Sequence, residues 1–139
     1  MLTEEQVLLI RESAAELAKM EIPATNAFYA NLFEVAPGVR ELFPDDMFKQ
    51  SEKLWQSIVM VVESADNPAE IAETLRTLGK RHVAYGAVPE HYPVVSEVLI
   101  ETISKTMSDK WSDEYKSAWQ AALTMVCDLM LEGARDVQS

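Results

Sequence analysis

The sequence predicts an all-α fold of about six to eight helices, and three observations lead to this prediction. Apolar residues recur every three or four positions along most of the chain, and no run alternates with period two. All six prolines fall where one inferred helix gives way to the next. Four glycines are too few for the many turns of an all-β chain. A chain of 139 residues supports one sizeable core, so we expect a single domain over residues 1–139.

Capping and proline signals place the helices of the N-terminal half. Residues 3–6, Thr-Glu-Glu-Gln, form a capping box for a helix that ends at about Met20. A first-turn proline starts a second helix, which ends before residues 36–38. A short helical piece over residues 39–42 leads to Asp45-Asp46, where either aspartate can cap the next helix. The expected buried face of that next helix is Met47, Gln50, Leu54, Ile58, Val61, Ser64 and Ala65.

Three more helices are expected in the C-terminal half. Asn67 is the predicted N-cap of the first, which stops at Gly86. Two prolines bracket the start of the second, and Ser112 caps the last, which we expect to fray from Arg135 on. The expected buried faces of the second and last helices are Tyr92, Val95, Leu99, Thr102 and Thr106, and Tyr115, Ala118, Trp119, Ala122, Val126 and Leu129.

Charge and cysteine content exclude several classes of function. The chain has 12 basic and 23 acidic residues, and a net charge of −11 repels nucleic acid and anionic membranes. No apolar run reaches the roughly eighteen residues of a membrane span, and the first residues are acidic where a secretory signal would be basic. Cys127 is the only cysteine, which excludes an internal disulfide and any multi-cysteine metal site. A cytoplasmic location is therefore expected.

His82 lies on the apolar stripe of its helix. Ile71, Leu75, Leu78 and Tyr85 are spaced three or four residues apart and form the expected buried face, with His82 between the last two. A buried imidazole needs a partner, because an unpaired ring nitrogen costs about 1–3 kcal/mol. On this stripe alone, His82 is either a histidine held by a hydrogen bond or a metal ligand.

Two further polar side chains fall on apolar faces. Tyr29 points inward from the second helix and Gln50 from the third, so both need hydrogen-bonding partners. Taken singly, each is compatible with an ordinary core position. Together with His82, they come from three different helices and indicate one cavity with a nitrogen ligand on one side and hydrogen-bond donors on the other.

The ligand set narrows the choice of cofactor. A di-iron bundle needs Glu-x-x-His pairs, and neither His82 nor His91 has a glutamate three residues before it. Zinc enzymes need two or three His, Cys or carboxylate ligands at short spacing, and the chain offers only His82 and His91. The chain also has no phosphate-binding glycine loop and no Gly-x-Ser-x-Gly elbow. A flat apolar cofactor that brings four equatorial nitrogens needs only one protein ligand. Haem has this property, because a single proximal histidine holds its iron in globins.

At these residues the sequence resembles the globin family, in particular the single-domain bacterial globins and the haem domain of flavohaemoglobins. The resemblance covers essentially the whole chain and is most specific over residues 78–92, Leu-Gly-Lys-Arg-His-Val-x-Tyr-Gly-x-Val-x-x-His-Tyr, where His82 takes the place of the proximal ligand. Tyr29 and Gln50 match the distal pair of the bacterial branch, and Gln50 precedes His82 by 32 residues. The resemblance implies a globin fold that encloses one b-type haem, with iron bound by His82. It assigns haem contacts to Phe43, Gln50, Lys53, Leu54, Leu78, Arg81, His82, Val88 and Tyr92, and ligand stabilisation to Tyr29 and Gln50.

The resemblance also implies the candidate functions. In flavohaemoglobins, a tyrosine placed as Tyr92 acts with a glutamate on the proximal histidine, but the matching position here is Ala134, and Glu132 lies about 200° round the helix. We expect a five-coordinate iron that binds dioxygen tightly and reversibly, with no catalytic residue assigned. The alternative is a nitric oxide dioxygenase that uses a separate reductase, because these residues contain no reductase domain. A gas sensor would need an output domain. Expected partners are dioxygen, NO or CO and an external reductase, without nucleic acid or membrane.

Overall fold

The structure, a computed structural model, describes residues 2–20 and 22–138, without the side chains of residues 22, 23, 137 and 138. It is all-helical as predicted, and the described residues form no strand. The helices are α1 (Glu4–Ala18), α2 (Ile22–Val35), the 3₁₀ helix η1 (Pro37–Leu42), α3 (Phe48–Glu63), η2 (Pro68–Ile71), α4 (Ala72–Ala84), α5 (His91–Met107), η3 (Ser108–Lys110) and α6 (Asp113–Gln138). No described helix is long and apolar enough to cross a membrane.

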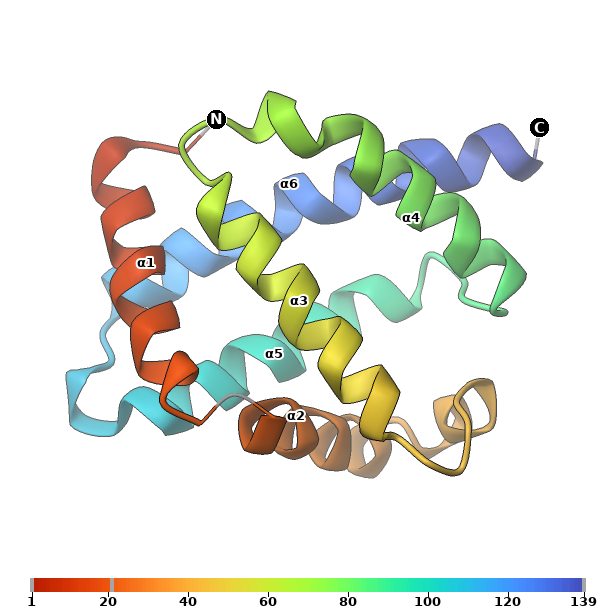
Figure 1. Ribbon diagram of the computed structural model, residues 1–139, viewed down its shortest axis with the longest axis horizontal. Helices are drawn as coiled ribbons and strands as arrows, with labels where there is room; N and C mark the ends of the chain where they lie inside the picture. Colours follow the sequence, from red (N-terminus) through yellow and green to blue (C-terminus); the bar gives the residue numbers. More distant parts are fainter. Residues whose placement is uncertain (1, 21, 139) are drawn as a thin grey trace.

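The helices form two layers that cross each other (Figure 1). In this view α3 runs in front of α5, and α4 lies in front of the C-terminal part of α6. α2 packs against α3 and α5, and α1 packs against α3, α5 and α6. α4 packs mainly against α6, so α3 and α4 rest on different neighbours. They diverge from the corner that joins them at η2, as Figure 1 shows.

Local sequence signals fix two of the helix ends. The capping box at Thr3 forms, with the threonine hydroxyl accepting from the Gln6 amide and the Gln6 side chain accepting from the Thr3 amide. Neither candidate aspartate is the N-cap of α3, which is Met47, but Asp46 accepts from the backbone N–H of Phe48 in the turn before the helix. Gly86 follows α4 at a φ of 94°, a conformation that costs little for glycine and ends the helix there.

Two details of the expected helices were wrong, the cap at Asn67 and the burial of Tyr85. Asn67 makes no capping bond to the backbone and precedes the 3₁₀ turn η2, from which α4 continues at residue 72. The first helix ends at Ala18, close to the expected end at about Met20, and α6 is helical to Gln138, so the expected fraying from Arg135 stays a prediction. Tyr85 is 57% exposed, and it is the C-cap residue that follows the last residue of α4, not a member of the helix.

The main core joins α1, α2, α3, α5 and α6 around Trp119, which is 1% exposed. The indole Nε1 of Trp119 donates to Ser13 Oγ at 2.7 Å, and the same hydroxyl donates to the Leu9 and Ile10 carbonyls at 2.8 and 3.0 Å. These bonds satisfy two buried polar groups that would otherwise cost about 1–3 kcal/mol each. The contact fixes α6 against α1.

α4 belongs to a second, smaller core cluster. Its buried members are Ile71, Leu75, Tyr92 and Met130, from η2, α4, α5 and α6. None of the buried residues of the main cluster comes from α4. The helix that carries His82 is therefore held by its own contacts, chiefly those with α6.

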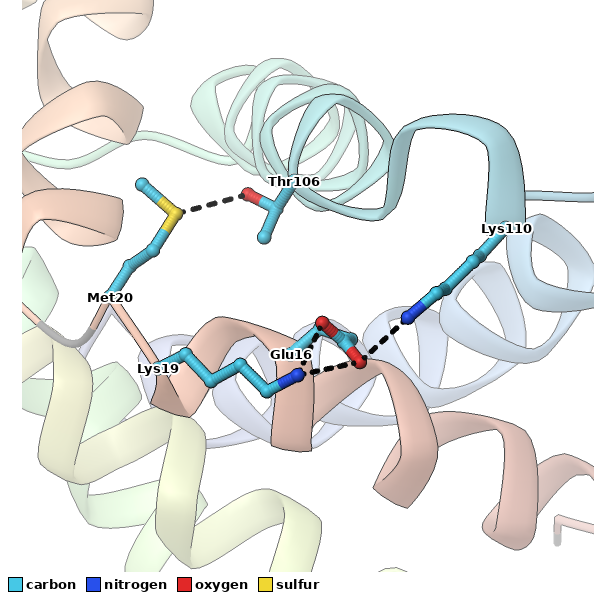
Figure 2. Close-up of polar contacts among 5 residues, drawn as sticks. All are labelled: Glu16, Lys19, Met20, Thr106 and Lys110. Carbon is cyan, nitrogen blue, oxygen red and sulfur yellow. Dashed lines mark hydrogen bonds and ion pairs between the residues drawn. The ribbon is translucent and has the colours of Figure 1, made fainter.

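The corner between α1 and α2 is tied to the end of α5 (Figure 2). Glu16 accepts from Lys19 at 3.1 Å and from Lys110 at 3.3 Å, and these two bonds lower the pKa of its carboxyl group below the ordinary value. The Thr106 hydroxyl donates to the sulfur of Met20 at 3.9 Å. Because these groups are exposed, the contacts orient the corner that precedes α2 more than they stabilise the fold.

Candidate functional site

α4 holds His82 in one defined orientation. The Nδ1 atom lies 2.8 Å from the carbonyl oxygen of Leu78, one turn earlier in the helix. A carbonyl only accepts, so Nδ1 carries the proton and Nε2 of the neutral ring keeps its lone pair. Burial lowers the pKa of His82 below its ordinary value, while the Leu78 carbonyl opposes this shift. Near neutral pH, His82 is a neutral imidazole whose Nε2 has no hydrogen bond to any residue that the structure describes.

Tyr29 and Gln50 are joined by a hydrogen bond. The amide Nε2 of Gln50 donates to the hydroxyl oxygen of Tyr29 at 3.1 Å, which joins α2 to α3. Tyr29 is 6% exposed, and its ring packs edge-on against Phe28 at 5.0 Å and Phe43 at 5.5 Å, and is stacked with Phe33 at 5.9 Å. This aromatic cage leaves the ring little freedom, so the hydroxyl has a fixed position.

The bond from Gln50 determines what the Tyr29 hydroxyl can do. Burial raises the pKa of this phenol above its ordinary value of 10.0, although the Gln50 bond lowers it in part. The group is therefore protonated near neutral pH. Because the Tyr29 oxygen accepts from Gln50, its own O–H can be donated to a third partner.

A second bond between α2 and α3 lies beside this pair, and the sequence analysis missed it. Ser51 is completely buried, and its hydroxyl donates to Asn26 Oδ1 at 2.7 Å. Ser51 follows Gln50 directly, and Asn26 precedes Tyr29 by one turn. The bond therefore fixes the spacing between the helices where Tyr29 and Gln50 meet. A serine next to a candidate site residue on a predicted helix was the only signal in the sequence.

The loop contacts connect the Tyr29 side of the site with the His82 side. An added Cβ on Gly86, just after α4, would lie 3.0 Å from a side-chain methyl of Leu42 in η1. Phe43 follows Leu42 and packs on the Tyr29 ring. Leu42, the last residue of η1, therefore lies near the turn after α4, and Phe43, the next residue, packs on the Tyr29 ring. That Tyr29, Gln50 and His82 face one cavity stays a prediction.

A pocket of about 390 Å³ lies between α3 and α4. It is lined by Ser57, Met60, Glu73, Thr74, Thr77, Leu78 and Arg81. Of the predicted haem contacts, Leu78 and Arg81 line this pocket, while Lys53, one turn before Ser57 on α3, is exposed. Phe43 and Leu54 are half-buried, and Val88 is 41% exposed. The structure thus places partly exposed apolar side chains and two cations, Lys53 and Arg81, on the helices and turns around the candidate site.

Tyr92 lies close to His82 but makes no hydrogen bond to it. Their ring centroids are 6.5 Å apart, and His82 Nδ1 bonds to Leu78 instead. Glu132, the nearest acid to the position that the resemblance assigns to glutamate, pairs with Arg76 at 3.4 Å. Near Tyr92, the Cys127 sulfur lies 3.5 Å from the Ser96 hydroxyl oxygen.

His91 is separate from this site. Its Nδ1 accepts a hydrogen bond from the Val88 backbone N–H at 3.2 Å, which ties the imidazole to the turn before α5. The side chain is half-buried, and its role is local, because the bond holds the turn that leads into α5.

The donor set fits haem. Among the described residues, no group of three or more His, Cys, Asp or Glu side chains is arranged to hold a metal ion. A metal at His82 would therefore need most of its ligands from another source, as the porphyrin ring provides. The free lone pair on Nε2 and the carbonyl bond to Nδ1 are what an axial haem ligand requires.

Comparisons with known proteins identify the family of the chain. A family model described as Globin matches residues 26–130. The chain is 28% identical to a flavohemoprotein of Deinococcus radiodurans over 134 residues, which cover 94% of this chain and 33% of that protein. It is 29% identical to leghemoglobin-1 of Lupinus luteus, with 97% of each chain covered. The chain spans about a third of the length of the flavohemoproteins that it matches.

The structural comparison leads to the same family. An engineered carbene transferase derived from a candidate nitric oxide dioxygenase of Rhodothermus marinus superposes with a TM-score of 0.88 at 26% identity, and the match covers 99% of this chain and 96% of that one. The region matched by the family model makes up most of the sequence and contains Tyr29, Gln50 and His82. The protein therefore belongs to the globin family, whose members bind haem.

Proposed function

We propose that this chain forms one globin domain over residues 1–139, holds one b-type haem through His82, and binds dioxygen reversibly. The observation that carries the proposal is the state of His82, a neutral imidazole with Nδ1 bonded to Leu78 and an available lone pair on Nε2. The absence of a Cys-x-x-Cys-His sequence supports a non-covalent haem, because c-type attachment needs that motif.

The residues around His82 supply the rest of the haem site. Phe43, Leu54, Leu78, Val88 and Tyr92 offer apolar surface to the porphyrin. Lys53 and Arg81, which have no ion pair with any described residue, are the cations that can bind the propionates. When bound, haem would supply an iron that binds diatomic gases.

Tyr29 and Gln50 act on the gas itself. Dioxygen acquires partial negative charge when it binds, and a hydrogen bond to a charged acceptor is worth about 1.5–3 kcal/mol. The Tyr29 O–H is available to make this bond, because its oxygen already accepts from Gln50. Gln50 therefore acts first by orienting the tyrosine, and its second amide proton is available for the gas. Carbon monoxide, with little charge on its outer atom, gains much less from the same donors.

The test is reversible gas binding by the purified, haem-loaded ferrous protein. Exposure to air and then to argon should produce a stable spectrum that returns to the deoxygenated one over several cycles. Rapid conversion to the ferric form in the first cycle, without a stable intermediate spectrum, would contradict reversible binding. The matched control is the His82→Ala variant in exogenous imidazole, because this variant lacks the His82 ligand but keeps Tyr29 and Gln50.

A nitric oxide dioxygenase is the second candidate. Its support is the similarity to flavohemoproteins and to the Rhodothermus marinus protein. Against it, His82 is bonded to a backbone carbonyl and not to a carboxylate, and Glu132 is paired with Arg76. The two functions separate when NO is added under air together with a reductase. Sustained consumption of NO would favour the enzyme, while a single turnover ending in ferric protein supports the carrier.

A further inference from the structure

The helix that carries His82 crosses α6 at two glycines. An ideal Cβ built on Gly79 of α4 would lie 1.8 Å from the Met130 carbonyl oxygen, and one built on Gly133 of α6 would lie 1.9 Å from the Arg76 carbonyl oxygen. Both glycines are buried. The contact is reciprocal, because each glycine faces a backbone carbonyl three residues away from the other glycine.

The atoms that fill these positions cannot move aside as a side chain can. Each carbonyl belongs to the backbone of a helix, and ordinary van der Waals contact of a Cβ begins at 3.4 Å, more than an ångström beyond the distances found here. A methyl group at either glycine therefore separates α4 from α6. Close crossings of this kind also allow Cα–H···O contacts between helices, which add a small attraction.

The position of α4 depends on this crossing more than on any other contact. α4 packs chiefly on α6, and its buried residues belong to the small cluster around Leu75 and Met130 rather than to the main core. By contrast, α2 and α3 are tied to each other by the Tyr29–Gln50 and Ser51–Asn26 bonds. We therefore expect a displacement at the crossing to move His82 more than Tyr29 and Gln50, which the α2–α3 bonds hold together.

We propose that Gly79 and Gly133 are positioning residues that set the place of the His82 imidazole by fixing how closely α4 approaches α6. His82 follows Gly79 by three residues, less than one helical turn, so little flexible structure separates the crossing from the ligand. The ion pair between Arg76 and Glu132 joins the same two helices at 3.4 Å. Because it is partly exposed, it contributes less to the distance between the helices than the glycine contacts do. The proposal rests on haem binding through His82.

The experiment compares Gly79→Ala and Gly133→Ala with Gly38→Ala, whose added Cβ would meet nothing within 4 Å. The first readout is resonance Raman spectroscopy of the iron–histidine stretch in the deoxygenated ferrous protein. We expect this frequency to shift in both α4–α6 variants and to match wild type in Gly38→Ala. Leu17→Ala, a destabilising change in the main core, should also leave it unchanged, which separates positioning from a general loss of stability.

The second readout is amide hydrogen exchange in the haem-free protein, and it does not depend on haem. The α4 amides of the two variants should exchange faster than in wild type, while those of α5 should change less. If either glycine variant fails to fold, Arg76→Ala decides, because an exposed ion pair can be removed without unfolding the chain. An unchanged frequency in Arg76→Ala supports the glycine crossing, and a shifted one would assign the positioning to the ion pair.

The failures of the two proposals differ. If wild-type protein takes up no haem, the proposed function is wrong, while faster α4 exchange in the glycine variants would still show that the crossing fixes α4. If wild type binds haem through His82 but both folded glycine variants keep its iron–histidine frequency and its α4 exchange rates, the positioning role is wrong.

Discussion

The hydrogen bond from Gln50 to Tyr29 makes the two donors unequal, and this can be measured in the rate of dioxygen release. In Tyr29→Phe the ring remains in its cage of Phe28, Phe33 and Phe43, and only the hydroxyl is lost. The lost bond to a partly charged acceptor is worth about 1.5–3 kcal/mol, and about 1.4 kcal/mol corresponds to a tenfold change. We therefore expect release to become roughly ten- to a hundredfold faster.

Gln50→Leu should have a smaller effect. This variant leaves the Tyr29 hydroxyl in place but removes its orienting donor at 3.1 Å, a neutral bond worth about 0.5–1.5 kcal/mol. Release should become roughly two- to tenfold faster. In the Tyr29→Phe background, Gln50→Leu should add little, because its main partner is already gone.

The assay is stopped-flow dissociation of dioxygen and carbon monoxide from wild type, both single variants and the double variant. Carbon monoxide release is the internal control, and it should be nearly unchanged in all four proteins. Equal effects of the two single variants that multiply in the double variant would refute the idea that Gln50 acts through Tyr29. Unchanged dioxygen release in Tyr29→Phe would refute any role of the pair in holding dioxygen.

Three further predictions concern stability. Haem binds the folded chain alone, so haem-free protein should melt below the loaded form, by about 2.7 kcal/mol in unfolding free energy at a ligand concentration of 100 Kd; equal melting temperatures in calorimetry would contradict this. Ser51→Ala should lower the unfolding free energy in urea by about 0.5–1.5 kcal/mol through loss of its 2.7 Å bond to Asn26, and an unchanged midpoint would remove this bond from the account. Burial lowers the pKa of His82 in the folded chain, so as the pH falls the unfolded chain takes up a proton on this imidazole before the folded chain does. The stability that neutral His82 contributes is therefore complete above pH 6.5 and is lost as the pH falls through the lower pKa of the folded chain. The haem-free His82→Gln variant should therefore lose less stability than wild type between pH 7.5 and 5, and parallel curves would contradict the shift.

The sequence was most informative where a polar residue occupied a position that periodicity assigned to the core. Tyr29 and Gln50 were placed on inward faces of two helices, and the structure joins them by a hydrogen bond. Such positions are predictable because burial forces a polar group to find a partner. The prediction for Tyr85 was wrong, since periodicity gives the face of a helix but not where the helix itself ends.

Long-range contacts between backbones were beyond the reach of the sequence. A glycine within a helix indicates a close approach or a cost in stability, but does not name what approaches. Gly79 and Gly133 could therefore not be paired before the crossing of α4 and α6 was known. The bond from Ser51 to Asn26 is similar, because serine and asparagine have many possible partners nearby in the chain.

Haem content is the most direct test of the central claim that His82 is the iron ligand of a haem site. Wild type, His82→Ala and His91→Ala would be purified in parallel, and the haem bound per chain measured from the absorbance spectrum. Because His91 only accepts a hydrogen bond from the turn before α5, His91→Ala should bind one haem with the wild-type spectrum. His82→Ala should lose the haem or show a clearly altered spectrum. A His82→Ala protein with wild-type haem content and an unchanged spectrum would contradict the assignment of the site.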